Sequence, residues 1–414
     1  MGLMRRLFLP LLFLVMLALL GGLYLGEAEP LLRGILDFYL VHYDLPPFGD
    51  AHGITSAMAC ERQGIETYLG NPCHYKPVTF VYPPVWKLLA FLPVDGRWTV
   101  PVALGFIAVF AAALYFLPPA QSRRGLLLGG LAVLSPATLM AADYGNNDML
   151  VFAVIVAAIA ALGWRPALGY GLLLLAGLLK YFPFAALGWA AGEQPRVTAW
   201  VAAALAGVLI LFVWLAGAQL PLSLASMVTM SAGSYVFGIK DLGIMANELG
   251  LVDGRGALAI RLAVTAALLL IGWQRATNFA LADVRTTMSA AEWRFLIVGS
   301  LVLLGAYFGS QNLVYRMIFV LLVLPGLDAL RAVPGQRFGA IAAIAVALMY
   351  LFPLRVHLQA LFTPGSGGEF LVTVIGILLR EALWFTLAAT LLGLVFVQLR
   401  AGPIWQRLSA QRST

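Results

Sequence analysis

Long runs of apolar residues are the feature that most constrains the fold of this chain. Roughly twenty apolar residues cross a bilayer as a helix, and the sequence offers about a dozen such runs. Hydrophobic residues make up 62% of the 414 residues and charged residues 11%, whereas a soluble domain carries about a quarter charged residues. The runs therefore predict an all-α polytopic transmembrane helical bundle with roughly 11 to 13 membrane helices, built as a single domain over residues 1–414.

The basic residues predict how such a bundle is oriented. The net charge is +7, and most arginines stand in short connections between apolar runs, where the positive-inside rule expects them on the cytoplasmic side. Membrane topology therefore explains the charge better than a nucleic-acid partner does. The first run, Leu7 to Leu25, follows Arg5 and Arg6 and has no small-residue cleavage site before Glu27, which predicts an uncleaved first span.

Counting spans from this start predicts the loops and the termini. Both termini, including a tail at residues 400–414, are expected in the cytoplasm, with the protein in the inner (plasma) membrane. Long extracytoplasmic loops are expected at residues 27–85 and 217–256, and the first of them should carry interfacial helices.

One apolar stretch is unlike the others because a lysine stands in its middle. The stretch from Ala167 to Gly192 contains Lys180 and Pro183. A single span would bury the lysine at mid-membrane, at a cost of at least about 3 kcal/mol. A helical hairpin that rises to Leu179, turns, and descends from Phe184 avoids this cost, and we predict the hairpin.

The first long loop contains the first candidate for chemistry. Its apolar residues between Glu29 and Tyr43 recur as in a helix lying at the interface, where Arg33, Asp37 and Asp44 share one face at spacings of four and seven. A carboxylate there can act as general base on a sugar hydroxyl. Alternatively, Asp37 and Arg33 form a surface ion pair that contributes little energy.

The two cysteines of the chain both lie in this loop. Cys60 and Cys73 are expected to form a disulfide, because an oxidising compartment favours one and the loop it closes is short. Two thiols are a poor metal site and His74 does not complete one, so no metal is expected.

Cations at the extracytoplasmic boundary are candidate binding groups. Lys180 and Arg316 lie where a lipid phosphate is the natural partner. Arg316 can instead extend to the headgroups from the start of a span, and Lys240 can pair locally with Asp241.

The polar turn DYGNND, residues 143–148, has two possible roles. Asp143, Asn146, Asn147 and Asp148 can bind sugar hydroxyls, or they can make the turn and cap the following helix. The first loop contains no Walker, GxGxxG or DxD motif, so neither a nucleotide nor a soluble cofactor is indicated.

Several stretches, in this order, resemble a known family. They are DFYLVHY (37–43), FVYPPVWKLLAFLP (80–93), YGNNDMLVF (144–152), LLKYFPF (178–184) and, more loosely, YRMIFVLLVLP (315–325). Together they resemble the integral-membrane GT-C-type glycosyltransferases, nearest the family 87 polyprenyl-phosphate-mannose-type transferases. The cysteine-bounded stretch NPCHYKP (71–77) has no counterpart that we can place in characterised members of the family.

The resemblance implies an inverting transferase that takes a sugar, a hexose such as mannose, from a polyprenyl-phosphate carrier at the extracytoplasmic face. A lipid or a glycan would accept the sugar. Asp37 matches the family's base and ranks above Asp44 and Asp50. The other predicted site residues would bind substrate or lipid phosphate: Lys180, Arg316, Tyr82, Asn147, Asp148, Asp44, His42 and Lys240. A transporter or flippase of a lipid-linked sugar is the alternative, and a non-catalytic homologue is a third.

Overall fold

The computed structural model describes residues 2–26, 28–40, 47–76, 78–227, 230–278, 287–309, 311–333, 337–403 and 405–406. Within these ranges every long element is a helix, and the one sheet has two strands, β1 (Val236–Phe237) and β2 (Asn312–Leu313), paired antiparallel. The chain is therefore an all-α polytopic membrane protein in class, as the apolar runs predict.

The helices that can span a membrane coincide with the predicted apolar runs. Among the described residues, 7 helices are long and apolar enough by length and composition, or up to 8 if a bent pair counts as one span. Three apolar helices are shorter, so the expected number of membrane helices stays a prediction. The long helices are α1 (Gly2–Leu25), α5 (Thr99–Phe116, preceded by the 3₁₀ turn η2, Gly96–Trp98), α6 (Arg123–Val133) continued by α7 (Pro136–Asp143), α10 (Pro195–Ala216), α13 (Gly254–Asn278), α15 (Ala290–Gly309) and α19 (Gly367–Ala401).

The remaining helices complete the bundle. The bent pair is α17 (Phe338–Leu348) and α18 (Leu351–Gln359), which meet at 55°. The central α16 (Val320–Ala329), flanked by η4 (Val314–Phe319) and η5 (Leu330–Ala332), is buried along its whole length. The shorter apolar helices are α8 (Asp148–Leu162), α9 (Pro166–Leu179) and η3 (Phe182–Gly192).

The hairpin predicted at Lys180 is confirmed. α9 ends at Leu179, Lys180 is extended, and η3 begins at Phe182. η3 then runs back along α15, because Phe182 approaches Gly305 while Gly188 approaches Leu301. Two short helices therefore replace one span, and the lysine stands at the turn between them.

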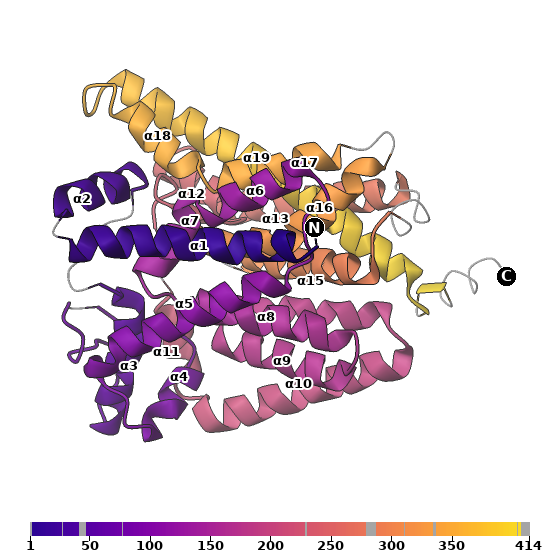
Figure 1. The fold of residues 1–414 in the computed structure, drawn as a ribbon, viewed down its shortest axis with the longest axis horizontal. Coiled ribbons are helices and arrows are strands. Elements are labelled where there is room, and N and C mark those ends of the chain that lie inside the picture. Colours follow the sequence, from indigo (N-terminus) through magenta and orange to yellow (C-terminus); the bar gives the residue numbers. More distant parts are fainter. Residues whose placement is uncertain are drawn as a thin grey trace.

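The first loop forms a cap at one end of the bundle (Figure 1). It contains α2 (Glu29–Phe38) and α3 (Gly49–Arg62), and α4 (Val85–Leu88) and η1 (Leu89–Phe91) continue from its last residue. The predicted disulfide is present between Cys60 and Cys73. The indole N–H of Trp86 donates to the Leu179 carbonyl at 3.2 Å, which ties the cap to the hairpin turn.

The second loop carries α11 (Leu220–Ala225), β1 and α12 (Asp241–Glu248), and is anchored by buried charges. Arg380 of α19 pairs with Asp241 at 2.9 Å and with its neighbour Glu381 at 2.9 Å. The same guanidinium donates to the carbonyl of Val236 at 2.7 Å. Charged hydrogen bonds of this kind are worth more than neutral ones and fix the loop against the bundle.

The start of α1 and the end of α19 lie toward the end of the bundle opposite the cap (Figure 1). Arg5 donates to the carbonyls of Ala120 and Gln121, and Arg400 donates to that of Ala276. The first loop, the DYGNND turn and the Lys180 hairpin share the other end, as the span count predicts.

Candidate functional site

The DYGNND turn positions the first charged group of the site. Gly145 adopts a left-handed conformation, φ 56°, that lets the chain leave α7 and enter α8 within a few residues. Asn146 Oδ1 accepts a hydrogen bond from the backbone N–H of Asp148 at 2.8 Å. Asp148 is the first residue of α8, where the helix dipole favours a negative charge. The turn therefore caps the helix and holds a buried carboxylate.

Asp148 holds two cations from distant parts of the chain. Its Oδ1 lies 3.2 Å from Nζ of Lys180 at the hairpin turn, and its Oδ2 lies 3.4 Å from Nε of Arg316 on η4. The Asp148 side chain is fully buried and that of Lys180 is 5% exposed. Removing one member of such a buried group leaves the others uncompensated, which typically costs about 3–5 kcal/mol. The three side chains therefore form a fixed, preorganised charge cluster.

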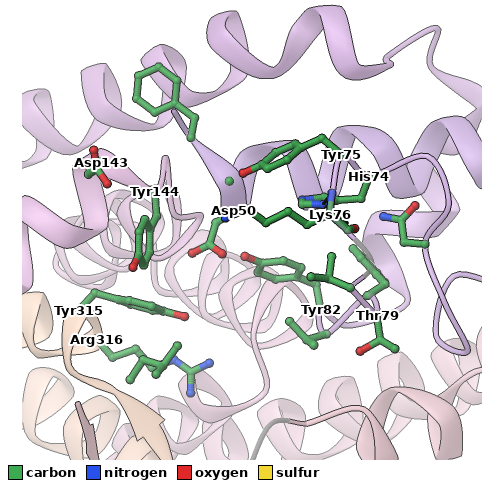
Figure 2. Close-up of a pocket in the computed structure, with 18 of the residues that line it drawn as sticks. Asp50, His74, Tyr75, Lys76, Thr79, Tyr82, Asp143, Tyr144, Tyr315 and Arg316 are labelled. Carbon is green, nitrogen blue, oxygen red and sulfur yellow. Dashed lines mark hydrogen bonds between the residues drawn. The ribbon is translucent and has the colours of Figure 1, made fainter. Parts of the chain in front are cut away.

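A second carboxylate, that of Asp50, lines a cavity together with Lys180 and Arg316, and Figure 2 shows it opposite Arg316. Asp50 is the second residue of α3, whose start docks onto the DYGNND turn: the N–H of Phe48 donates to the Asp143 carbonyl and that of Asp50 to the Tyr144 carbonyl, each at 3.0 Å. Phe48 takes a left-handed conformation at φ 68°, which is uncommon for a residue other than glycine. These two hydrogen bonds hold the backbone of Phe48 in this conformation and fix the start of α3 against the turn.

Polar side chains hold the Asp50 carboxylate in place. The side-chain amide of Asn146 and the hydroxyl of Tyr82 both donate hydrogen bonds to it. Burial raises the pKa of Asp50 above its ordinary value of 3.8, and the hydrogen bond from Asn146 and the charge of Lys180 oppose that rise. A carboxylate with a raised pKa is a better proton acceptor than an exposed one.

Two buried tyrosines join the two halves of the site. The Lys180 ammonium lies 5.1 Å from the ring centroid of Tyr82 and 5.8 Å from that of Tyr315. Burial raises the pKa of Tyr82 well above 10, so its hydroxyl remains a hydrogen-bond donor at neutral pH. The carboxylate of Asp50 is therefore linked through Tyr82 to the cation beside Asp148.

Two adjoining cavities meet at the cations. The first, about 660 Å³, is the one between Asp50 and the charge cluster, and it is also lined by residues of the segment after the second cysteine, among them His74, Tyr75 and Lys76. The second, about 480 Å³, is mostly apolar and extends between the hairpin, α11 and the end of α15. The residues that line both cavities are Val81, Lys180, Leu313, Tyr315 and Arg316.

The structure brings together only some of the residues that the sequence predicts. Lys180, Arg316, Tyr82 and Asp148 form the centre of the site. Asn147 is buried beside them but lines neither cavity, and neither its Nδ2 nor its Oδ1 has a hydrogen-bond partner among the described residues.

The other predicted residues lie away from the centre. Lys240 precedes α12 and lines neither cavity. Asp37 is exposed on α2 and also lines neither cavity. His42 and Asp44 lie outside the described residues.

Asp50 ranks below Asp37 in the sequence but lines the first cavity, and neither Tyr315 nor the hydrogen bond from Asn146 to Asp50 is predicted from the sequence. The signal for Asp50 was slight: it follows Gly49 at the start of a helix, beyond Pro46-Pro47. Tyr315 precedes the predicted Arg316, but a tyrosine at the start of an apolar run is ordinary.

Among the described residues no three His, Cys, Asp or Glu side chains gather as a metal site would require. Comparisons with protein-family models, with curated proteins and with solved structures find no match.

Proposed function

We propose that this protein is an inverting glycosyltransferase that moves a hexose, such as mannose, from a polyprenyl-phosphate carrier to a lipid or glycan acceptor. One observation carries the proposal: a pair of cations stands where a mostly apolar cavity joins a second cavity, and a carboxylate lines that second cavity together with them. A lipid tail, a phosphate and a proton acceptor are the three elements that this reaction needs.

The cations suit the phosphate of the donor. Lys180 and Arg316 would receive the phosphate oxygens, where negative charge develops as the sugar leaves. The apolar cavity would hold the isoprene units next to the phosphate, because it starts at the same two side chains. Gly309 borders this cavity with no atom within 4 Å of the place its Cβ would take, which keeps room for a chain.

Asp50 is the base in the proposed reaction, in place of Asp37. The acceptor O–H gives its proton to the Asp50 carboxylate while its oxygen forms the bond to the anomeric carbon from the side opposite the phosphate. The bond from that carbon to the phosphate oxygen breaks and leaves polyprenyl phosphate. Asp50 is preferred because it lines the cavity that the cations line, whereas Asp37 does not.

The orientation in the membrane is part of the proposal. Short connections rich in arginine at the end that carries the termini, such as those holding Arg123, Arg124, Arg165 and Arg196, support a cytoplasmic location for that end of the chain. The disulfide supports an oxidising compartment for the other end. The site would then face away from the cytoplasm in the inner membrane, as in the GT-C-type family that the sequence resembles.

Transfer of labelled mannose from polyprenyl-phosphate mannose in proteoliposomes tests the proposal. Lys180→Met and Arg316→Met should each lower transfer by about a hundredfold or more, while Lys240→Met, a matched control at the same end, should retain it. Size-exclusion profiles and an Arg316→Lys variant, which keeps the charge, separate loss of function from loss of fold.

The alternatives give different outcomes in the same assay. Movement of the labelled lipid across the bilayer with no new glycosidic bond would indicate a transporter. Binding without transfer or movement would indicate a non-catalytic homologue. Either result would overturn the proposed function.

A further inference from the structure

The segment that follows the disulfide forms one wall of the first cavity. We call residues 71–76 the strap. It is tied to α3 at three places: the disulfide from Cys73 to Cys60, a 2.9 Å hydrogen bond from Asn71 Nδ2 to the hydroxyl of Ser56, and a hydrogen bond from His74 to the backbone of Gly49. A wall held in this way is fixed relative to Asp50, the residue after Gly49.

The strap faces the cations from across the base. His74, Tyr75 and Lys76 line only the first cavity, whereas the cations Lys180 and Arg316 line both. Figure 2 shows Asp50 between Tyr75 and Arg316. A ligand bound at the strap would therefore reach Asp50 from one side, and a ligand bound by Lys180 and Arg316 would reach it from the other.

The strap presents an aromatic surface to the cavity. The ring of Tyr75 stacks on that of His74 at a centroid distance of 4.4 Å, and both approach His52 at 4.9 and 4.8 Å. Burial lowers the pKa of both histidines, so the rings remain neutral at physiological pH. Tyr75 is 37% exposed and lines the cavity, and the Lys76 ammonium lies 5.7 Å from its ring centroid, so an aromatic and cationic surface borders the cavity here.

Asn71 adds an unsatisfied polar atom to the same wall. The residue is 3% exposed and lines the cavity, and its Oδ1 has no hydrogen-bond partner among the described residues. A buried acceptor without a donor is costly and calls for a ligand that supplies one. A hydroxyl group is such a donor.

We propose that the strap is the acceptor-binding wall, and that it takes a pyranose ring whose flat face packs on Tyr75 and one of whose hydroxyls donates to Asn71. This inference rests on the proposed function for the direction of transfer, and it names a carbohydrate as the acceptor class. His74 and the disulfide are positioning elements that hold Tyr75 and Asn71 beside Asp50.

Saturation-transfer NMR with methyl α-D-mannopyranoside and methyl β-D-glucopyranoside tests the wall without requiring turnover. The purified protein is first saturated with farnesyl phosphate, whose binding is measured separately by calorimetry. At least one glycoside should bind the wild type, and Tyr75→Ala and Asn71→Leu should each weaken that binding by about tenfold. Trp98→Ala, which removes an exposed aromatic ring that lines neither cavity, should leave it unchanged.

The two readouts separate failure of this inference from failure of the proposed function. If farnesyl phosphate binds and depends on Lys180, but neither glycoside binds or Tyr75→Ala and Asn71→Leu bind as the wild type does, the strap is not the acceptor wall. If farnesyl phosphate binding does not depend on Lys180 or Arg316, the proposed donor site is wrong. Asn71→Leu also removes the hydrogen bond from Nδ2 to Ser56, so Ser56→Ala, which removes that bond and keeps Asn71 Oδ1, is its control and should bind the glycoside as the wild type does.

Discussion

Replacing Asp50 by asparagine tests the central assignment of the site. The substitution keeps the side-chain shape and one acceptor oxygen for the donors Asn146 and Tyr82, but it removes the charge and the proton-accepting group. Loss of a general base typically costs about 10²- to 10⁴-fold in rate, or roughly 3–5 kcal/mol of transition-state stabilisation. Mannose transfer by Asp50→Asn in proteoliposomes should fall by that factor.

Asp37→Asn is the matched comparison because it makes the same chemical change in the same loop. Asp37 is exposed and lines neither cavity, so this variant should retain transfer within about twofold. Full activity of Asp50→Asn together with loss of activity in Asp37→Asn would refute the assignment and return the role of base to Asp37.

The pH profile provides a second check on Asp50. The base must be deprotonated to act, so activity should fall as the pH drops through the pKa of Asp50. Burial raises that pKa above 3.8, so the acid limb should have its midpoint above that value. Tyr82→Phe removes a hydrogen bond to the charged form and should move the midpoint higher still. An unchanged midpoint in Tyr82→Phe would contradict this account of the limb.

Three further predictions test other parts of the structure. Gly309→Leu should place a side chain in the apolar cavity, because a Cβ at this position meets no protein atom within 4 Å. Loss of about ten carbon–carbon contacts with the lipid at roughly 0.1 kcal/mol each, about 1 kcal/mol in all, should raise the KM for a polyprenyl donor about fivefold. Gly207→Leu on α10, where a Cβ also meets no atom within 4 Å, is the control. The double variant Cys60→Ser/Cys73→Ser should lose about 3 kcal/mol of unfolding free energy by chain entropy and raise the KM for the acceptor but not for the donor. Burial raises the pKa of Asp241 to about 6, so the folded state binds a proton at this carboxyl more tightly than the unfolded state does. The stability that this proton contributes, up to about 3 kcal/mol, is lost as the pH rises through about 6. Asp241→Asn should therefore flatten this part of the plot of stability against pH, measured by scanning fluorimetry.

Much of the architecture could be predicted because it follows from local constraints. The apolar runs marked the helices, since the bilayer sets their length. A lysine in the middle of such a run forced a turn, and the hairpin at Lys180 is present. The disulfide followed from there being two cysteines on the same side of the membrane.

The site itself was harder to predict because it depends on tertiary docking. Spacings of four and seven predict that Arg33, Asp37 and Asp44 share a helix face, but α2 ends at Phe38, before Asp44, and no spacing indicates what such a face meets. Asp50 enters the site because the start of α3 binds backbone carbonyls of the DYGNND turn, which is about ninety residues further along the chain. Neither side of that contact carries a local pattern, and the left-handed Phe48 that allows it is not a glycine.

The DYGNND turn has both a structural role and a place in the candidate site, whereas the sequence offered these as alternatives. Asn146 caps the next helix and also donates to Asp50 through its amide. Asp148 does not line the first cavity. Its carboxylate instead holds Lys180 and Arg316 together. The turn therefore shapes the start of α8 and also supports both Asp50 and the two cations.

The arrangement of charge explains why these residues would stand where they do in the proposed reaction. Before transfer the donor phosphate carries one negative charge and Asp50 another; afterwards Asp50 is neutral and the departing phosphate carries two. One negative charge thus moves from Asp50 to the phosphate. Burial, which raises the pKa of Asp50, favours the neutral carboxyl at one end of that movement. Lys180 and Arg316, held by Asp148, stabilise the charge at the other end, so both ends of the site favour the same direction of transfer.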